Sequence, residues 1–391
     1  MGRRTGRADL PLHGGRVPSW LAARMARLGR VVAEAVVLHY GPDEFLRRLA
    51  HPFWFQAFGS VMGMDWHSSG ITTSVVGALK RGLEPVASEL GVFVCGGRGR
   101  HSRKTPGELN AIAERVGIDG DALGRCSRLV AKVDNAAVQD GFDLYLHSFV
   151  VTAGGSWAVI QQGMNPALRQ ARRYHWLSEN LESFVDQPHT AIHGHSRGCI
   201  FNLTDARARP SRSAQLELVR EGPDRAVAAI RDMRPVAVPV QPPLPHLQMP
   251  SRHEICGSDV VLKRLHATLA AASDRGPKDF AELLLTPGVG PRTVFALAMA
   301  SEVIHGTASR FSDPARFSTA LGGKDGHPFP VPLRVYDETI RILRQAVDGA
   351  RLGREDKLSA IARLDEESRR IDRHLTGPSF DDFIENQRRK N

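Results

Sequence analysis

The segment from Lys132 to Asp140 holds the side chains best suited to catalysis in this sequence. Asp134 falls beside the apolar stripe of a predicted helix, where an unpaired carboxylate would be costly. Phosphodiester hydrolysis needs carboxylates that hold Mg²⁺ or Mn²⁺, a group that activates water, and cations for the developing phosphate charge. We therefore expect Asp134 and Asp140 to hold the metal, although a buried salt bridge of Asp134 with Arg128 or Lys132 is an equal alternative. The catalytic candidates of this region are Lys132, Asp134, Gln139, Asp140 and, on the strand that follows, Gln161.

Asp65 and His67 form a second candidate group. Being two residues apart, they would face the same side of a strand and could share a metal or activate water. Ser68 and Ser69 could instead cap the next helix, an alternative that leaves His67 without a role. We expect His67 to be a third metal ligand, and we count Asp65 and His175 among the catalytic candidates.

The segment from Thr286 to Thr293 lies between two apolar helical runs and predicts a helix-hairpin-helix, a motif that grips the DNA backbone. Its glycines allow backbone shapes and close approaches that larger residues reach only at a cost. The free N–H groups that open the second helix would bind a phosphate, which positions a duplex without reading its bases. An ordinary turn between helices is the alternative. The predicted DNA contacts are Gly288, Gly290, Arg292 and Thr293.

Six further basic residues and one tryptophan are predicted to contact DNA. They are Arg98, Arg103 and Lys104 in a glycine-rich stretch, Arg172, Arg173 and Trp176 in an aromatic one, and Lys324. The glycine-rich stretch could embrace phosphates. The aromatic stretch suits a phosphate and a stacked, unpaired base. A basic helix face with Trp176 in the core is an equal alternative for it.

The composition fits a folded protein with a polyanionic partner. The chain has 391 residues, of which 42% are hydrophobic, a formal net charge of +10 and a pI near 9.9. No apolar run is long enough to cross a bilayer, and the first residues lack the apolar stretch of a signal peptide. We therefore expect a cytoplasmic, nucleoid-associated protein that binds DNA and no membrane, and a homodimer is left open.

Cysteine and histidine spacing gives little support to zinc. The four cysteines are scattered, so neither a zinc knuckle nor a dense disulfide framework is visible. His189, His193 and His195 could bind zinc, but no cysteine or acidic ligand follows at a matching spacing. A solvent-exposed loop is the favoured interpretation of these histidines.

The candidates must be positioned by a mixed sheet and its helices. The pattern predicts helices over residues 19–38 and 121–138, and strands over residues 142–151 and 157–162. A two-residue turn at Gly154 and Gly155 would pair Ser148 with Gln161, in a register that could slip by one.

The predicted fold class is α+β. An N-terminal mixed α/β domain with a β-hairpin, residues 1–205, would carry the catalytic site. An Arg/Pro-rich linker, residues 206–252, would lead to an all-helical DNA-binding domain, residues 253–391, with the helix-hairpin-helix at residues 280–304.

Several long, unusual strings of residues resemble the prokaryotic family catalogued as domain of unknown function 763. They run over most of the chain and include Leu10–Gly15, Asp65–Gly70, Gln161–Met164, Ala171–Trp176 and Gly322–Pro328. The resemblance implies a helix-hairpin-helix, and hence nucleic acid, but no particular chemistry.

Side-chain chemistry and the hairpin together predict a metal-dependent DNA endonuclease. It would be structure-selective and act on unpaired or distorted DNA, such as bubbles, flaps and single strands. A DNA glycosylase is the first alternative, because Asp313 follows the hairpin at about the spacing of the catalytic Asp in that class. A non-enzymatic repair or replication scaffold is the second.

Overall fold

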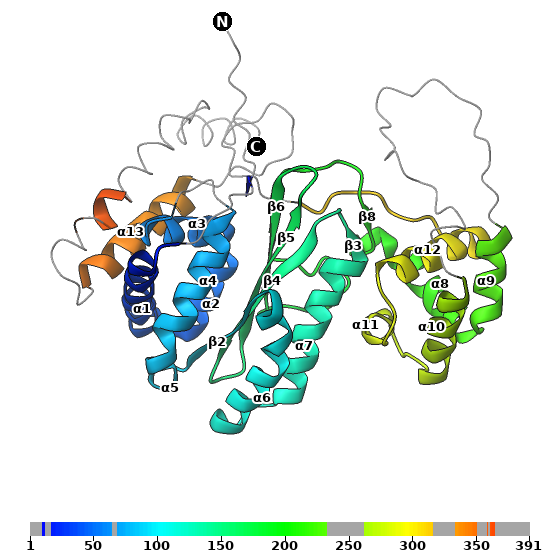
Figure 1. The fold of residues 1–391 in the computed structure, drawn as a ribbon, viewed down its shortest axis with the longest axis horizontal. Coiled ribbons are helices and arrows are strands. Elements are labelled where there is room, and N and C mark those ends of the chain that lie inside the picture. Colours follow the sequence, from blue (N-terminus) through cyan, green and yellow to red (C-terminus); the bar gives the residue numbers. More distant parts are fainter. Residues whose placement is uncertain are drawn as a thin grey trace, which may run out of the picture.

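The computed structural model describes residues 10–11, 17–64, 69–232, 262–315, 333–349, 358 and 360–363. Within these residues the chain is α+β, as predicted, with an N-terminal region of helices and sheet. Helices lie on both sides of a central sheet, and a further cluster of helices lies beyond one side (Figure 1).

The central sheet is antiparallel, with the strand order β1-β6-β5-β4-β2 and with β7 paired to β6. Its strands are β1 Leu10–Pro11, β2 Val92–Arg98, β4 Asp143–Thr152, β5 Trp157–Asn165, β6 Gln170–Leu177 and β7 Ala191–His193. Because side chains alternate along a strand, β2, β4 and β5 each contribute to two separate cores, one on each face.

The β4–β5 hairpin has a register one residue away from the two-residue turn that we expected. His147, not Ser148, pairs with Gln161. Residues 153–156 connect the strands, and the Gly155 N–H donates to the Thr152 carbonyl at 3.0 Å. This longer turn shifts the register, so the His147 and Gln161 side chains meet on the same face of the sheet.

Helices from the N-terminal part of the chain cover one face. They are α1 Ser19–Tyr40, α2 Pro42–Ala50, α3 Pro52–Val61, α4 Gly70–Leu83 and α5 Ala87–Leu90, and α13 Leu333–Gly349 packs on α1 and α3. Pro42 and Pro52 stand in the first turns of their helices, where a backbone N–H is not required. Every residue of α3 is buried, which makes it the centre of this layer.

The other face is covered by α6 Thr105–Val116 and α7 Gly120–Lys132. Asp119 caps α7 by accepting from the Ala122 N–H at 2.9 Å. We expected one helix over residues 121–138. Instead α7 is followed by a π-helix, Val133–Ala137, and by β3 Val138–Gln139, which pairs with β8 Phe201–Asn202.

The segment predicted as a linker, residues 206–252, contains two helices between residues 209 and 232. The helices are α8 Arg209–Arg220 and α9 Pro223–Asp232, which pack with α10 Leu262–Arg275 and α12 Pro291–His305, while α11 Phe280–Leu285 packs on α8. Pro210, which suggested a linker, stands in the first turn of α8, where proline is tolerated. Residues 233–252 of that linker lie outside the described residues.

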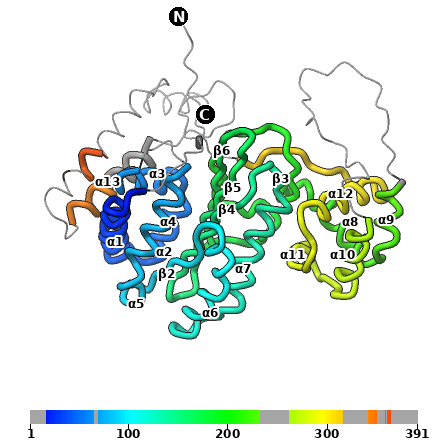
Figure 2. The backbone as a smooth tube through the Cα atoms, viewed as in Figure 1, coloured from blue at the N-terminus to red at the C-terminus, as the bar shows by residue number. Residues whose placement is uncertain are grey.

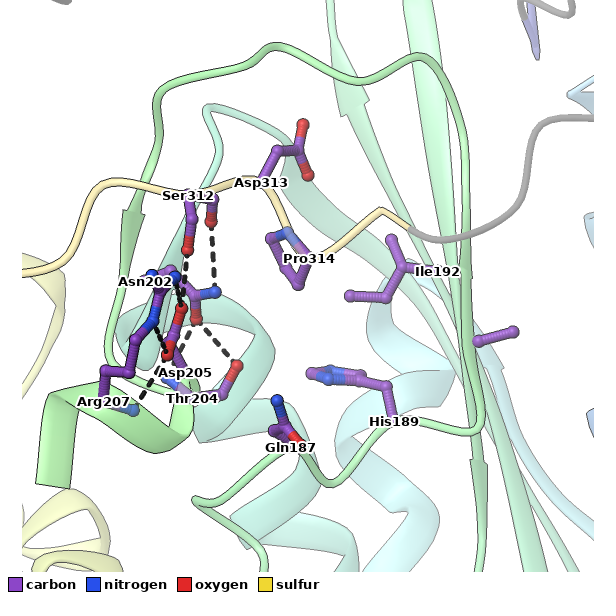
Figure 3. Close-up of a pocket in the computed structure, with 11 residues that line it drawn as sticks. Gln187, His189, Ile192, Asn202, Thr204, Asp205, Arg207, Ser312, Asp313 and Pro314 are labelled. Atoms are coloured by element: carbon purple, nitrogen blue, oxygen red, sulfur yellow. Dashed lines mark hydrogen bonds and ion pairs between the residues drawn. The ribbon is translucent and has the colours of Figure 1, made fainter. Parts of the chain in front are cut away.

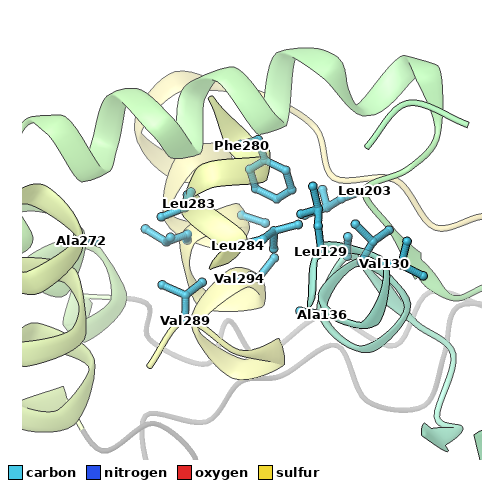
Figure 4. Close-up of a cluster of buried hydrophobic side chains, with 14 of the residues drawn as sticks. Leu129, Val130, Ala136, Leu203, Ala272, Phe280, Leu283, Leu284, Val289 and Val294 are labelled. Carbon is cyan, nitrogen blue, oxygen red and sulfur yellow. The ribbon is translucent and has the colours of Figure 1, made fainter. Parts of the chain in front are cut away.

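The helical cluster and the sheet share a hydrophobic core. Phe280, Leu284 and Val294 lie beside Leu129 and Val130 of α7 (Figure 4). After α12 the chain returns toward the strands (Figure 2), and the N–H of Asn202 in β8 donates to the Arg310 carbonyl at 2.9 Å. Among the described helices, none has the length and apolar content needed to cross a membrane.

Candidate active site

The π-helix Val133–Ala137 positions a buried carboxylate. Such short π-helical turns occur frequently at functional sites. Asp134 Oδ2 accepts hydrogen bonds from Gln161 Nε2 and, at 2.9 Å, from Trp176 Nε1. Asp134 Oδ1 is paired with His189 Nε2 at 2.5 Å. The carboxylate is therefore bound by three side chains from separate parts of the sheet region.

His189 links this carboxylate to a cavity of about 220 Å³ (Figure 3). Its ring packs against Trp176, with the ring centroids 4.5 Å apart, and its side chain is 6% exposed. Among the described residues, Nδ1 of His189 has no hydrogen-bond partner. An imidazole that donates through Nε2 to a carboxylate has Nδ1 available to accept a proton.

The wall of the cavity opposite His189 is polar and tightly bonded. Asn202 Oδ1 accepts from the N–H and the hydroxyl of Thr204, at 2.9 and 2.7 Å. Arg207 donates to Asp205 at 2.6 Å, and Ser312 donates to the same carboxylate at 3.0 Å. The Arg207 hydrogen bond holds the pKa of Asp205 well below its usual range. The Arg207 side chain is 66% exposed and is the cation at the rim of the cavity.

Asp140 belongs to a different hydrogen-bonded group. It accepts from Phe142 N–H at 3.0 Å, Arg172 Nη1 at 2.9 Å and Tyr174 Oη at 2.6 Å. In this arrangement Asp134 and Asp140 do not form a shared ligand set for a divalent cation. The salt bridge of Asp134 with Arg128 or Lys132 is also not formed in the part of the chain that the structure describes. Over the same residues, no group of three or more His, Cys, Asp or Glu side chains is placed to hold a metal.

Arg172 is a structural residue and not the DNA contact that we predicted. Its guanidinium is fully buried and also donates to Asp313 at 2.7 and 3.0 Å. Asp313 further accepts from the N–H groups of Arg197 and Ala315, at 2.6 and 2.9 Å. Its carboxylate points away from His189 (Figure 3). The partners of Arg172 are 32 and 141 residues away, so local sequence could not show them.

Three other predictions on β6 fail because the strand is buried on both faces. Arg173, His175 and Trp176 are 0% exposed. Trp176 faces Asp134 and cannot stack on a base. It lies in the core, as in the alternative that we considered, but on a strand instead of a helix. Arg173 and His175 face the opposite layer, where Arg173 Nε donates to His175 Nε2 at 2.8 Å. His175 is therefore not part of the Asp134 site.

Lys132 and Gln139 anchor a turn instead of joining Asp134. Lys132 Nζ donates to the Val289 carbonyl, and Gln139 Nε2 donates to the Pro291 carbonyl at 2.8 Å. Burial lowers the pKa of Lys132. The π-helical segment thus contacts the α11–α12 turn through its flanking residues and His189 through Asp134.

The α11–α12 turn presents unbonded main-chain N–H groups. Gly288 has a φ of +85°, which favours glycine, and no atom within 4 Å would meet a Cβ placed on Gly290. Over the described residues, the N–H groups of Gly288, Gly290, Arg292 and Thr293 have no hydrogen-bond acceptor. Arg292 is exposed, whereas the Thr293 side chain is buried, so Thr293 can offer only its N–H.

The remaining predicted residues divide into two groups. Arg98, Arg103 and Lys104 are exposed at the end of β2 and in the short helix Gly99–Lys104, and no carboxylate of the described part of the chain pairs with them. Asp65, His67 and Lys324 lie outside the described residues.

The prediction of a solvent-exposed histidine loop is wrong for His189 and His193. His193 is buried in β7, where its Nδ1 is 2.9 Å from Arg173 Nη2, and burial holds its pKa well below the usual range. The adjacent apolar residues Ala191 and Ile192 were the sequence indication of a strand here, and both are buried. No sequence pattern joins His189 to Asp134, which is 55 residues away.

Comparison with known proteins gives one match. The family described as "Protein of unknown function (DUF763)" matches residues 6–331. No curated protein and no solved structure shows significant similarity to the chain. The match covers most of the sequence, including the Asp134–His189 pair, its cavity and the α11–α12 turn, and the chain therefore belongs to the DUF763 family.

Proposed function

We propose that this protein is a DNA endonuclease, with the cavity at His189 as its reaction site. The observation that carries the proposal is the pairing of His189 Nε2 with the buried carboxylate of Asp134. The carboxylate fixes the ring and stabilises the imidazolium that forms when Nδ1 takes a proton. His189 is thus suited to activate a water molecule for attack on a phosphodiester, and Arg207 lies at the rim where phosphate charge would develop.

DNA binding is proposed to use the α11–α12 turn as a helix-hairpin-helix. Its unbonded N–H groups and the dipole of the 15-residue α12 favour a phosphate at Gly290. Four exposed cations would add an attraction to the DNA phosphates that does not depend on the base sequence. They are Arg98, Arg103, Lys104 and Arg292. Attachment of the turn to both flanks of the π-helix would keep bound DNA close to the Asp134–His189 pair.

The size of the cavity supports selectivity for unpaired DNA. At about 220 Å³ it is smaller than the roughly 300–1,000 Å³ of pockets for drug-sized ligands. A duplex therefore cannot enter, whereas the base of a nucleotide displaced from the stack is of a size that we propose to fit. This argument replaces base stacking on Trp176, which is buried.

A requirement for Mg²⁺ or Mn²⁺ stays a prediction. Mg²⁺ is commonly held by one or two carboxylates together with substrate phosphates, so it can require DNA as well as protein. Asp134 and Asp140 do not fit as its shared ligands in this arrangement.

The proposal is tested with the full chain and three undamaged DNAs, a bubble, a flap and a matched duplex. We expect nicking of the bubble and the flap in Mg²⁺ or Mn²⁺, little nicking of the duplex, and none in EDTA. Nicking that continues in EDTA would contradict the metal requirement alone. Binding without cleavage of any DNA would support the scaffold alternative. Base excision from a damaged duplex, lost in D313N, would support the glycosylase, which the buried pairing of Asp313 disfavours.

A further inference from the structure

We propose that Ser127, His147 and Gln161 form a positioning chain that fixes the proton arrangement of Asp134 and His189. Its importance for catalysis rests on the proposed function, whereas its hydrogen bonding does not. Ser127 Oγ is 2.9 Å from His147 Nε2, and His147 Nδ1 is 2.7 Å from Gln161 Oε1. Gln161 then contacts Asp134 through Nε2, which continues the chain to His189.

The direction of every bond follows from Asp134. A carboxylate only accepts hydrogen bonds, so the Gln161 amide must direct its NH₂ group to Asp134 and its oxygen to His147. His147 must then carry its proton on Nδ1, and its unprotonated Nε2 accepts from the Ser127 hydroxyl. Burial lowers the pKa of His147, which is consistent with this neutral ring.

The hydrogen bonds of Asp134 also fix the proton on the His189 ring at the cavity. Gln161 and Trp176 both donate to Oδ2 of Asp134, which leaves Oδ1 to His189. His189 therefore carries a proton on Nε2, and in the neutral ring the lone pair is on Nδ1. Rotation of the carboxylate would break two bonds to Oδ2, so Gln161 and Trp176 fix the orientation in which His189 is held.

The chain is an uncommon feature in an apolar layer. Ser127, His147 and Gln161 are at most 6% exposed and lie among the buried side chains of Phe149, Val159 and neighbouring residues. Apolar residues of similar shape would avoid the need to match each donor with an acceptor. The complete matching of this chain indicates a role that depends on proton placement.

The direct test is ¹⁵N NMR of the imidazoles in the full chain labelled at histidine, without DNA, at neutral pH. We expect His147 as the Nδ1–H tautomer and His189 as the Nε2–H tautomer, assigned with the variants H147Q and H189N. The opposite tautomer on either ring would overturn the inference. Because no cleavage is measured, this result is independent of whether the protein is a nuclease.

Two variants test the coupling. In Q161L the His147 ring loses its acceptor, so we expect loss of the single His147 tautomer and a fall in kcat of about 10–100-fold with KM unchanged. The matched control is Q162L, since Gln162 is equally buried but faces the opposite layer, where it contacts Ser69 and Tyr145. S127A is a milder variant that removes only the donor to His147 Nε2.

The outcomes of these variants are distinguishable. An unchanged His147 spectrum in both Q161L and S127A would contradict the inference. Equal losses of kcat in Q161L and Q162L would show a merely structural effect and would also contradict it. If the expected tautomers are found and H189N still cleaves DNA at the wild-type rate, the positioning chain stands and the proposed reaction fails.

Discussion

The ammonium group of Lys132 donates a hydrogen bond to the carbonyl of Val289, and this contact joins two elements that lie 157 residues apart in the sequence. Lys132 ends α7, two residues before Asp134, and Val289 lies between the two glycines of the α11–α12 turn. The turn proposed to bind DNA is thus attached directly to the segment that carries Asp134, the buried carboxylate of the proposed catalytic pair.

We predict that K132M weakens DNA binding although Lys132 touches no DNA in this account. The variant keeps the apolar stem and removes the donor to Val289, so the turn loses one of its two anchors. The free energy of unfolding should fall by about 1.5–3 kcal/mol, as for hydrogen bonds to charged groups. Urea unfolding and fluorescence anisotropy with labelled DNA measure the two effects. K263M, which alters an exposed lysine of α10, is the control, and equal effects of both variants would contradict the prediction.

The second prediction concerns Gly290. Its φ of −137° is open to any residue and its surroundings are empty, so G290L should fold normally while its side chain blocks a phosphate. We expect the Kd of G290L for DNA to be about tenfold or more above that of the wild type, whatever the DNA sequence. Binding of DNA by the wild type should weaken as the salt concentration rises. G154L, in the β4–β5 turn, is the matched control. If folded G290L binds DNA with unchanged affinity, the α11–α12 turn is not a DNA-binding helix-hairpin-helix.

How much the sequence reveals depends on the separation of the interacting residues. Local patterns predicted the first helix, the β4–β5 hairpin and the burial of Asp134 correctly. They could not predict that Trp176 and His189, 42 and 55 residues from Asp134, complete its hydrogen bonds.

The wrong predictions on β6 have a related cause. Arg172 and Arg173 read as a basic surface because their acceptors are distant in sequence. A one-residue shift in the β4–β5 turn, which sequence patterns fix only weakly, also decides that His147 meets Gln161.

We predict that R172L destabilises the protein severely. Its removal leaves Asp140 and Asp313 as buried carboxylates without their shared cation. Breaking a buried ion pair in this way costs about 3–5 kcal/mol, so the midpoint of urea unfolding should fall sharply. R292L, at the exposed start of α12, should leave the midpoint unchanged. A stable R172L protein with impaired DNA binding alone would instead restore Arg172 as a DNA contact.

Acidification should destabilise the fold. Burial lowers the pKa values of His147, His175 and His193, so these rings resist protonation when folded. In the unfolded chain they take up protons below about pH 6.5, so the unfolded state binds more protons and stability falls as the pH falls. At pH 5.5 each ring that stays neutral in the folded state lowers the free energy of unfolding by about 1.4 kcal/mol. A urea midpoint as high at pH 5.5 as at pH 7.5 would contradict this prediction.

The most direct test of the central claim is the single-turnover rate at which H189N nicks a bubble DNA. The matched control is H266N, because His266 is paired with Asp224 on the protein surface in the same way that His189 is paired with buried Asp134. The account predicts that H189N cleaves at least about 100-fold more slowly than the wild type, with DNA affinity within about twofold, and that H266N is unaffected. Cleavage by folded H189N at the wild-type rate would contradict the assignment of His189 as the general base.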